Sequence, residues 1–384
     1  MIARSFILIL FFFISLSARA AEPFEIKEGD RVLLLGDTLL ERENTYGYLE
    51  TRMHEQFPDR HFIVRNLSWA GETPRGWSRA SFDPPGKGFE RLKEDIGKVR
   101  PTVVFLGFGM AASLQEMTDR SGDITLNPDP ARYGAEPMSA ARFKRELGEL
   151  MDAIVGSAAG AAPPGSTRVS RVGSGVTPER TSTDVAKSEK SPASEAATKV
   201  RDGVTPSPTR ETRALPGAAI RFVLLSPIRH EDLRAIRPGL PDPAEHNRLL
   251  EQYSKAIEEL AKERGARFVD LFPLGSRPPL FTENGIHFGA AGYRMLRDEF
   301  AINLGWRLFK SAIDTPKRPF PLRAAVIRKN ELFFHQFRPA NSTYLFGFRK
   351  HEQGQNAREI PLFDPLVEAQ EKTIASIRKS LTRQ

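Results

Sequence analysis

Five short apolar runs, separated by segments of helical periodicity, constrain the fold of this chain more than any other feature of its sequence. The runs have the length of strands and cover residues 31–36, 61–66, 102–107, 220–226 and 267–271. Apolar residues recur at helical spacing over residues 46–57, 88–98, 139–155 and 245–263. Strands that alternate with helices favour a parallel sheet with helices on both faces and right-handed crossovers. We therefore predict an α/β fold of three layers.

Polar residues gather where the predicted strands end. Asp37 and Thr38 follow the first strand, residues 69–72 follow the second, and residues 108–112 follow the third. In an open parallel sheet, ligands bind outside the carboxyl ends of the strands. We therefore expect the functional residues at this edge, within reach of a histidine on a late loop such as His287.

One internal segment, residues 156–217, differs in composition from the rest of the chain. It consists mainly of Ala, Gly, Ser, Thr and Pro with scattered charges, and large apolar residues are almost absent. Such a stretch cannot offset its ordering entropy by burial, so we predict a disordered insertion. Because loop closure costs little even for long loops, we expect residues 21–155 and 218–312 to form one domain around it. Residues 313–384 are predicted to be a C-terminal appendage.

The N-terminus predicts export. Arg4 precedes an apolar run over residues 6–16, and Ala18 and Ala20 are the small residues that a signal peptidase needs. Residues 1–20 are therefore predicted to be a cleaved signal peptide, with an uncleaved anchor as the alternative. The apolar run is too short to span a bilayer comfortably. The expected location is periplasmic or secreted, with no stable membrane span after cleavage.

The composition bears on which kinds of site are possible. The chain has no cysteine, which excludes disulfides, thiolate metal sites and lipoprotein attachment. Its seven histidines show neither HxH nor HExxH spacing, so we expect no dedicated metal site and no cofactor. The net charge of +8 comes from 56 basic and 48 acidic residues that are scattered along the chain, which argues against a nucleic-acid partner.

Four short blocks follow one another along the chain. They are GDT at 36–38, NLSWAG at 66–71, GMAA at 109–112 and NGIH at 284–287. Together they resemble the four blocks of the SGNH or GDSL hydrolases, over roughly residues 28–308. The segment NELFFHQFRPANSTYLFGFRKHEQGQN resembles the tail of SGNH-like domains in secreted proteins of planctomycete-type bacteria. The resemblance implies the SGNH hydrolase fold, a flavodoxin-like five-stranded parallel sheet, with a helical C-terminal appendage.

The resemblance also implies a catalytic set, which departs from the family pattern. Thr38 stands at the position of the nucleophilic Ser, His287 at that of the base, and Asn284 replaces the Asp that orients the base. The branching methyl group of threonine restricts χ1 and crowds the attack. An Asn in place of the orienting Asp lowers turnover by about 10⁴-fold, because it favours the wrong tautomer of the base. Glu283 is an alternative orienting residue, and Thr38 as a simple helix cap is the alternative to a nucleophile.

The implied oxyanion hole is altered as well. The backbone N–H groups of Gly71 and Thr38 are its remaining donors, beside Asp37 in the same site, whereas Ala111 stands where the family has an Asn side chain. Loss of one such donor typically costs about 100- to 1,000-fold in rate. The hydroxyl of Ser113 is one candidate replacement.

Further candidates lie near the same edge. Residues 41–43 are expected to line a polar cleft or to be ordinary surface charges. Trp69 and Trp77 flank the second block and either stack on a sugar ring or pack in the core. His230 and Glu231 follow the fourth predicted strand and form a possible second acid/base pair, although their spacing is common.

The sequence therefore favours a secreted hydrolase of ester bonds. O-acyl groups of carbohydrates are the preferred substrate class, and a small-molecule or carbohydrate ester is the predicted partner. The alternative is a catalytically degenerate binding module of the same fold, for a glycan or a protein. Ala111 and Asn284 favour the binding module, whereas His287 and Gly71 favour the enzyme.

Overall fold

The computed structural model describes residues 22–80, 83–114, 138–160, 219–274, 276, 280–308 and 320–381. The predicted signal peptide, residues 1–20, lies outside the described residues, as does the predicted insertion beyond residue 160. No helix in the described ranges is long and apolar enough to cross a membrane.

A five-stranded parallel sheet forms the centre of the fold. Its strands are β1 (Arg31–Gly36), β2 (Ile63–Asn66), β3 (Val103–Gly107), β4 (Arg221–Leu225) and β5 (Arg267–Val269). They are ordered β2-β1-β3-β4-β5, and every neighbouring pair is parallel. This is the flavodoxin-like order. The predicted fold class is confirmed, and so is the existence of all five strands.

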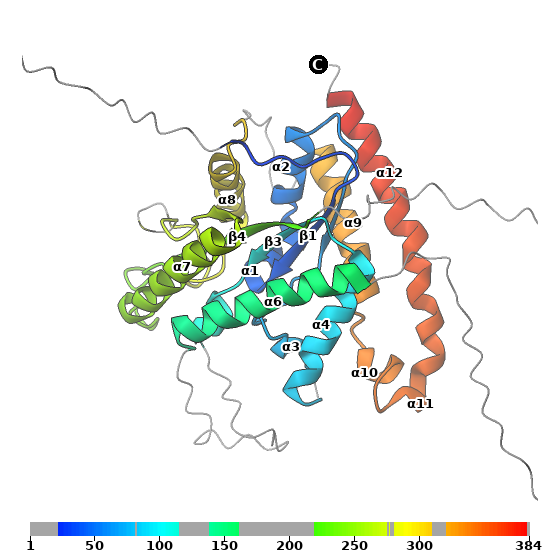
Figure 1. Cartoon of the computed structure of the whole chain (residues 1–384), viewed down its shortest axis with the longest axis horizontal. Helices are drawn as coiled ribbons and strands as arrows, with labels where there is room; N and C mark the ends of the chain where they lie inside the picture. The colour runs from blue at the N-terminus through cyan, green and yellow to red at the C-terminus, as the bar shows by residue number, and fades with distance from the viewer. Residues whose placement is uncertain are drawn as a thin grey trace, which may run out of the picture. The chain divides into compact units, whose positions relative to one another are not determined.

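Both faces of the sheet are buried, because successive side chains of each strand point to opposite sides. In β1, Val32 and Leu34 belong to one core, whereas Leu33 and Leu35 belong to the other. The first core is completed by α2 (Tyr48–Gln56) and α8 (Ala290–Asn303). The second is completed by α4 (Pro85–Val99), α6 (Ala140–Gly160) and α7 (Ala244–Arg264). The sheet between two helical layers can be followed in Figure 1.

Two helices, not one, lie between β1 and β2, and the predicted helix is the second of them. α1 (Thr38–Tyr46) begins directly after β1, and Gly47, with φ of 64°, separates it from α2. The predicted helix over 46–57 corresponds to α2 within two residues, whereas α1 was not predicted because it lacks a clear apolar stripe: its buried positions are Leu40 and Glu43. Two short helices, α3 (Trp77–Ala80) and α5 (Met110–Leu114), follow β2 and β3 and were not predicted.

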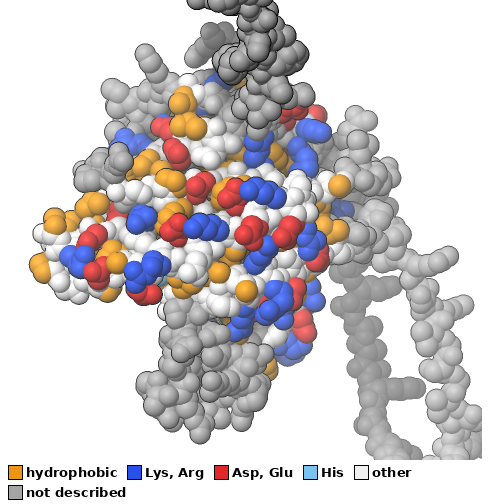
Figure 2. Space-filling model, turned by 60° about the vertical axis from the view of Figure 1, so that its left-hand side comes forward, with side chains coloured by type: hydrophobic (Ala, Val, Ile, Leu, Met, Phe, Trp, Pro, Cys, Tyr) orange, Lys and Arg blue, Asp and Glu red, His pale blue; other side chains and the backbone are white. Residues whose placement is uncertain are grey.

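Other boundaries shift by a few residues. α6 continues past residue 155, where the insertion was predicted to begin, to Gly160. α8 ends at Asn303, and Gly305 with φ of 71° follows it. Figure 2 shows Lys and Arg side chains interspersed with Asp and Glu on the face that it presents.

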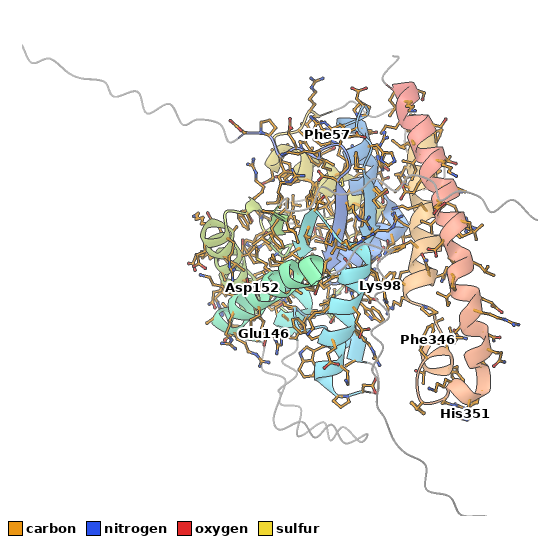
Figure 3. All side chains as sticks on the ribbon, turned by 45° about the vertical axis from the view of Figure 1, so that its right-hand side comes forward. Phe57, Lys98, Glu146, Asp152, Phe346 and His351 are labelled. Atoms are coloured by element: carbon orange, nitrogen blue, oxygen red, sulfur yellow. The ribbon has the colours of Figure 1, made fainter. Side chains whose placement is uncertain are left out.

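The C-terminal part is helical, as predicted. It contains α9 (Pro321–Phe337), α10 (Ser342–Leu345), α11 (Lys350–Gln353), a 3₁₀ helix η1 (Gly354–Leu362) and α12 (Phe363–Leu381). Figures 1 and 3 show α9 and α12 side by side. Lys329 of α9 is fully buried, and its Nζ donates to Glu50 Oε2 (2.8 Å) and to the Val64 carbonyl (2.9 Å). A buried ion pair therefore connects α9 to α2, and a hydrogen bond from the same lysine connects it to β2.

Candidate active site

Asp37 fixes the turn between β1 and α1. Its side chain is buried, and one oxygen accepts from the Leu39 N–H at the start of α1 (3.3 Å). The other oxygen accepts from the N–H groups of Gly109 and Ala111, at 3.2 Å each. Burial raises the pKa of Asp37 to about 6, although these backbone donors lower it. The Ala111 N–H is thus taken by Asp37, and Asp37 joins the loops after β1 and β3.

Thr38 occupies the first turn of α1, at the carboxyl edge of the sheet. Its Oγ1 accepts a hydrogen bond from the Gly71 N–H at 3.2 Å, so residues from the loops after β1 and β2 meet here. Gly71 has φ of 71°, a conformation that favours glycine. The Thr38 N–H belongs to the first helical turn, whose donors have no acceptor within the helix and lie at the positive end of its dipole.

The loop that carries His287 is a tight, hydrogen-bonded turn. The Glu283 N–H donates to the His287 carbonyl (2.7 Å). The side-chain oxygen of Asn284 accepts from the N–H groups of Ile286 (3.3 Å) and His287 (3.0 Å). The Asn284 side-chain nitrogen lies 3.1 Å from Nδ1 of the His287 ring. Asn284 therefore orients His287 with its nitrogen, since its oxygen is already occupied.

This arrangement selects the tautomer of His287. An amide nitrogen is only a donor, so Nδ1 must accept and the neutral ring carries its proton on Nε2. Burial lowers the pKa of His287, and the positive charge of Arg42 lowers it further. The ring is accordingly neutral at pH 7 and offers an N–H donor rather than a free lone pair at Nε2.

Glu283 does not orient His287. Its carboxylate accepts from the Arg42 guanidinium at 2.9 Å, and Arg42 also donates to the Tyr46 hydroxyl at 3.2 Å. The hypothesis that Glu283 replaces the family's Asp was therefore wrong, because the carboxylate is engaged by a cation from α1. The pair instead connects α1 to the loop of His287.

Thr38 and His287 line the same small pocket. Its cavity volume is about 10 Å³, which is close to the minimum that holds one water molecule. The other lining residues are Asp37, Leu39, Gly107, Phe108, Met110, Ser226, Pro227, Ile228 and Ile286. Within the described residues, the Thr38 hydroxyl and the His287 ring share this pocket without a direct hydrogen bond. Catalytic hydrogen bonds often form only when substrate is bound.

His230 and Glu231 are not an acid/base pair. The buried Glu231 carboxylate accepts from the N–H groups of Phe281 and Thr282 and from the Thr282 hydroxyl. The Glu231 N–H donates to the Gly285 carbonyl at 2.8 Å. Glu231 therefore holds the loop that carries His287 in place, which is a structural role rather than proton transfer.

His230 instead takes part in a chain that the sequence did not predict. Its Nδ1 lies 3.0 Å from His246 Nδ1, and His246 Nε2 lies 2.7 Å from the Ser113 hydroxyl. The Ser113 hydroxyl also donates to the Met110 carbonyl (2.8 Å), and Ser113 is only 2% exposed. Burial lowers the pKa of His246 to about 4, and the neighbouring His230 adds to this shift. Ser113 is thus engaged away from Thr38 and does not replace an oxyanion donor.

Trp69 lies close to two guanidinium groups. Arg338 lies 3.7 Å from the centre of its ring and Arg79 lies 5.0 Å from it. Arg338 follows α9 and also donates to Glu41 (3.0 Å). Both cations contact the indole, so its role is packing, whereas Trp77 is half-buried in α3.

Among the described residues, no three His, Asp or Glu side chains are grouped so that they could hold a metal ion.

Comparison with known proteins leaves the family open. No family model and no curated protein matches the chain. Two similar solved structures are Axe2, an acetylxylan esterase from Geobacillus stearothermophilus, and a mutant of the same enzyme. They have TM-scores of 0.42 and 0.44, identities of 14% and 13%, and cover 75% of this chain and 100% of theirs. A third is BT4096, a gut microbial diltiazem-metabolizing enzyme, at 14% identity and a TM-score of 0.41, over 73% of this chain and 48% of that one.

Proposed function

We propose that this chain hydrolyses small acyl esters, with O-acetyl groups of carbohydrates as its substrates. The observation that carries the proposal is the convergence of the Thr38 hydroxyl, the Gly71 N–H and the His287 ring at the carboxyl edge of a parallel sheet. These three groups supply a nucleophile, an oxyanion donor and a base, which together define a site for acyl transfer.

In this mechanism the Thr38 hydroxyl attacks the ester carbonyl carbon and its proton passes to Nε2 of His287. The resulting oxyanion accepts from the N–H groups of Gly71 and Thr38. Collapse breaks the bond to the alcohol oxygen, which takes the proton from His287 and leaves an acyl-Thr38 ester. A water molecule then attacks that ester and gives a proton to His287, which passes it to the departing Thr38 oxygen, so that the acid is released and the free hydroxyl and neutral His287 are restored.

The size of the pocket limits the acyl group. A cavity of about 10 Å³ encloses roughly one water molecule, so the proposal favours a small acyl group such as acetyl over a longer chain. The alcohol portion of the ester is then expected to lie outside this pocket.

The proposed hydrolase is slow. To act as a base, His287 must leave Nε2 unprotonated and carry its proton on Nδ1. A proton on Nδ1 would face the –NH₂ group of Asn284, which is itself a donor. In a Ser-His-Asp site the same change costs about 10⁴-fold in turnover. The Ala111 N–H donates to Asp37, so it is not a third donor to the oxyanion.

The test is hydrolysis of phenyl acetate and acetylated oligosaccharides by the full chain. Thr38→Val keeps the shape of the side chain and removes the hydroxyl, and His287→Gln removes the base. Both variants should abolish acetate release while their circular dichroism stays that of the parent. Acetate release that survives both substitutions would rule out the site.

A binding module is the second candidate, and one observation favours it. With Nδ1 facing a donor, neutral His287 presents an N–H at Nε2, which suits a ligand carbonyl better than it suits catalysis. This candidate predicts that the acetylated sugar binds without turnover and that His287→Gln weakens binding while Thr38→Val does not.

We also propose that the protein acts outside the cytoplasm after cleavage of residues 1–20. Mass spectrometry of the protein recovered from its native host should find an N-terminus at Ala21. An N-terminus at Met1 would contradict the proposal.

A further inference from the structure

Arg338, the first residue after α9, reaches from the C-terminal appendage to the loops of the proposed catalytic site. Its backbone N–H donates to the Phe334 carbonyl at 2.9 Å, which closes the last turn of α9. Its guanidinium donates to the Glu41 carboxylate at 3.0 Å, and the guanidinium carbon lies 3.7 Å from the centre of the Trp69 ring. Arg338 therefore connects the appendage both to α1 and to the loop after β2.

The contact with Glu41 bears on the nucleophile. Glu41 lies three residues after Thr38 on α1, so the two side chains share one face of that helix. The side chains of Glu41 and Arg338 are only 19% and 26% exposed, so salt screens their attraction less than it would at an open surface. This ion pair therefore restrains the face of α1 that carries Thr38.

The contact with Trp69 bears on the oxyanion donor. The Glu72 N–H donates to the Trp69 carbonyl at 3.1 Å, which closes a turn with Gly71 at its third position. φ is positive there, which favours glycine, and the Gly71 N–H donates to Thr38 Oγ1 at 3.2 Å. The guanidinium stacked on the indole restrains the first residue of this turn. One side chain thus acts on both partners of the Thr38–Gly71 contact.

The two contacts together depend on the shape of a guanidinium group. A planar guanidinium stacks on an aromatic ring while the N–H groups at its edge donate to a carboxylate, whereas a lysine ammonium is a point charge and cannot do both. Burial lowers the pKa of Arg338 from its ordinary value; Glu41 raises it, and the nearby charge of Arg79 lowers it. The contacts with Glu41 and Trp69 offset the cost of placing a second cation in this position.

From these contacts we infer that Arg338 is a positioning residue of the proposed hydrolase. It acts from the appendage and holds the Thr38 hydroxyl and the Gly71 N–H in the arrangement that attack on an ester and stabilisation of the oxyanion both require. A misplacement of about 1 Å in such a geometry costs about 100-fold in rate. The inference rests on the proposed function for its kinetic part, whereas the Thr38–Gly71 contact can be measured without turnover.

The kinetics of Arg338→Ala test this role. With phenyl acetate, kcat should fall about 10- to 100-fold while KM changes less than about 3-fold, because Arg338 contacts the loops of the site and not the substrate. Ethylguanidinium at millimolar concentration should restore part of the lost kcat, since it can stack on Trp69 and donate to Glu41. Arg338→Lys should also be slow, and ethylguanidinium should not restore it.

Glu371→Ala is the matched control. Glu371 of α12 pairs with Arg65 of β2, and both side chains are 16% exposed, so this pair also connects the appendage to the α/β part. The control should lower the melting temperature about as much as Arg338→Ala does and leave kcat unchanged. The inference is overturned if Glu371→Ala lowers kcat as much as Arg338→Ala, or if folded Arg338→Ala keeps the kcat of the parent.

An NMR measurement separates this inference from the proposed function. In protein labelled with ¹⁵N-glycine, Thr38→Val removes the acceptor of the Gly71 N–H and defines how its chemical shift and hydrogen-exchange rate change when the contact is lost. Arg338→Ala should move the Gly71 signal in the same direction, and ethylguanidinium should move it back. If the parent cleaves no ester, the proposed hydrolase fails and the Gly71 signal alone decides the role of Arg338. A Gly71 signal that does not respond to Arg338→Ala refutes that role.

Discussion

Asn284→Asp is the substitution that most directly tests the chemistry of this site. An aspartate of the same shape keeps one oxygen for the N–H groups of Ile286 and His287, at the 3.3 and 3.0 Å contacts seen for the asparagine. Its second oxygen replaces the nitrogen that lies 3.1 Å from His287 Nδ1. A donor that faces the ring is thereby exchanged for an acceptor. The favoured tautomer changes from Nε2–H to Nδ1–H, and Nε2 becomes free to accept the Thr38 proton.

The expected gain follows from the reverse substitution in a Ser-His-Asp site, which lowers turnover by about 10⁴-fold. At about 1.36 kcal/mol for each factor of ten, the full effect is about 5 kcal/mol of transition-state stabilisation. The threonine methyl and the missing oxyanion donor still limit the rate, so we expect between about 10² and 10⁴-fold in kcat. The new carboxylate also favours the protonated ring and moves the acidic limb of the pH profile upward.

The assay is acetate release from phenyl acetate across pH 5 to 9, together with ¹⁵N chemical shifts of the His287 ring. The control is Asn284→Ala, which removes the contact to the ring and should give no gain. The reasoning is refuted if folded Asn284→Asp is no faster than the parent although its ring shows the Nδ1–H tautomer. It is also refuted if the parent ring already carries its proton on Nδ1.

Three further predictions concern the same loops. Thr38→Ser should raise kcat about 10-fold, because the β-methyl group that crowds the attack is removed; an unchanged or lower kcat in the acetate assay would exclude crowding. Asp37→Asn should lower the free energy of unfolding in urea by about 2 kcal/mol, since an amide cannot accept from all three N–H groups; an unchanged free energy of unfolding would contradict this. The pKa of His246, about 4 when folded, lies below its unfolded value near 6.5, so its contribution to stability is lost as pH falls from 6.5 toward 4. His246→Gln should flatten that part of the urea-unfolding profile, and an equal slope in both proteins would count against it.

The sheet was predictable because its strands are apolar on both faces. In β1, Val32 and Leu34 enter one core while Leu33 and Leu35 enter the other, so the strand is a continuous apolar run. The first helix was not predictable in the same way. Its inward positions include Glu43, which is fully buried and accepts from the Leu49 N–H. Burial raises the pKa of Glu43 to about 8, and periodicity of apolar residues cannot reveal such a position.

The site was predictable in its place but not in its chemistry. The sequence places Thr38 and Gly71 after strands and His287 on a late loop, and the structure brings the first two into contact and the third into the pocket that Thr38 lines. The orientation of the Asn284 amide depends on two backbone donors in a folded turn, which residue spacing does not specify. The chain from Ser113 through His246 to His230 joins residues that are far apart in sequence, and no local motif marks it.

Lys329 also determines which fragments of this chain can exist alone. A fragment that ends before α9 would take away the cation beside the Glu50 carboxylate, which is 1% exposed in the full chain. Loss of the partner of a buried charge costs at most about 3–5 kcal/mol, less the hydration that the uncovered carboxylate regains, against the roughly 5–15 kcal/mol that stabilises a typical domain. The α/β part is therefore expected to be less stable without the helices that follow it.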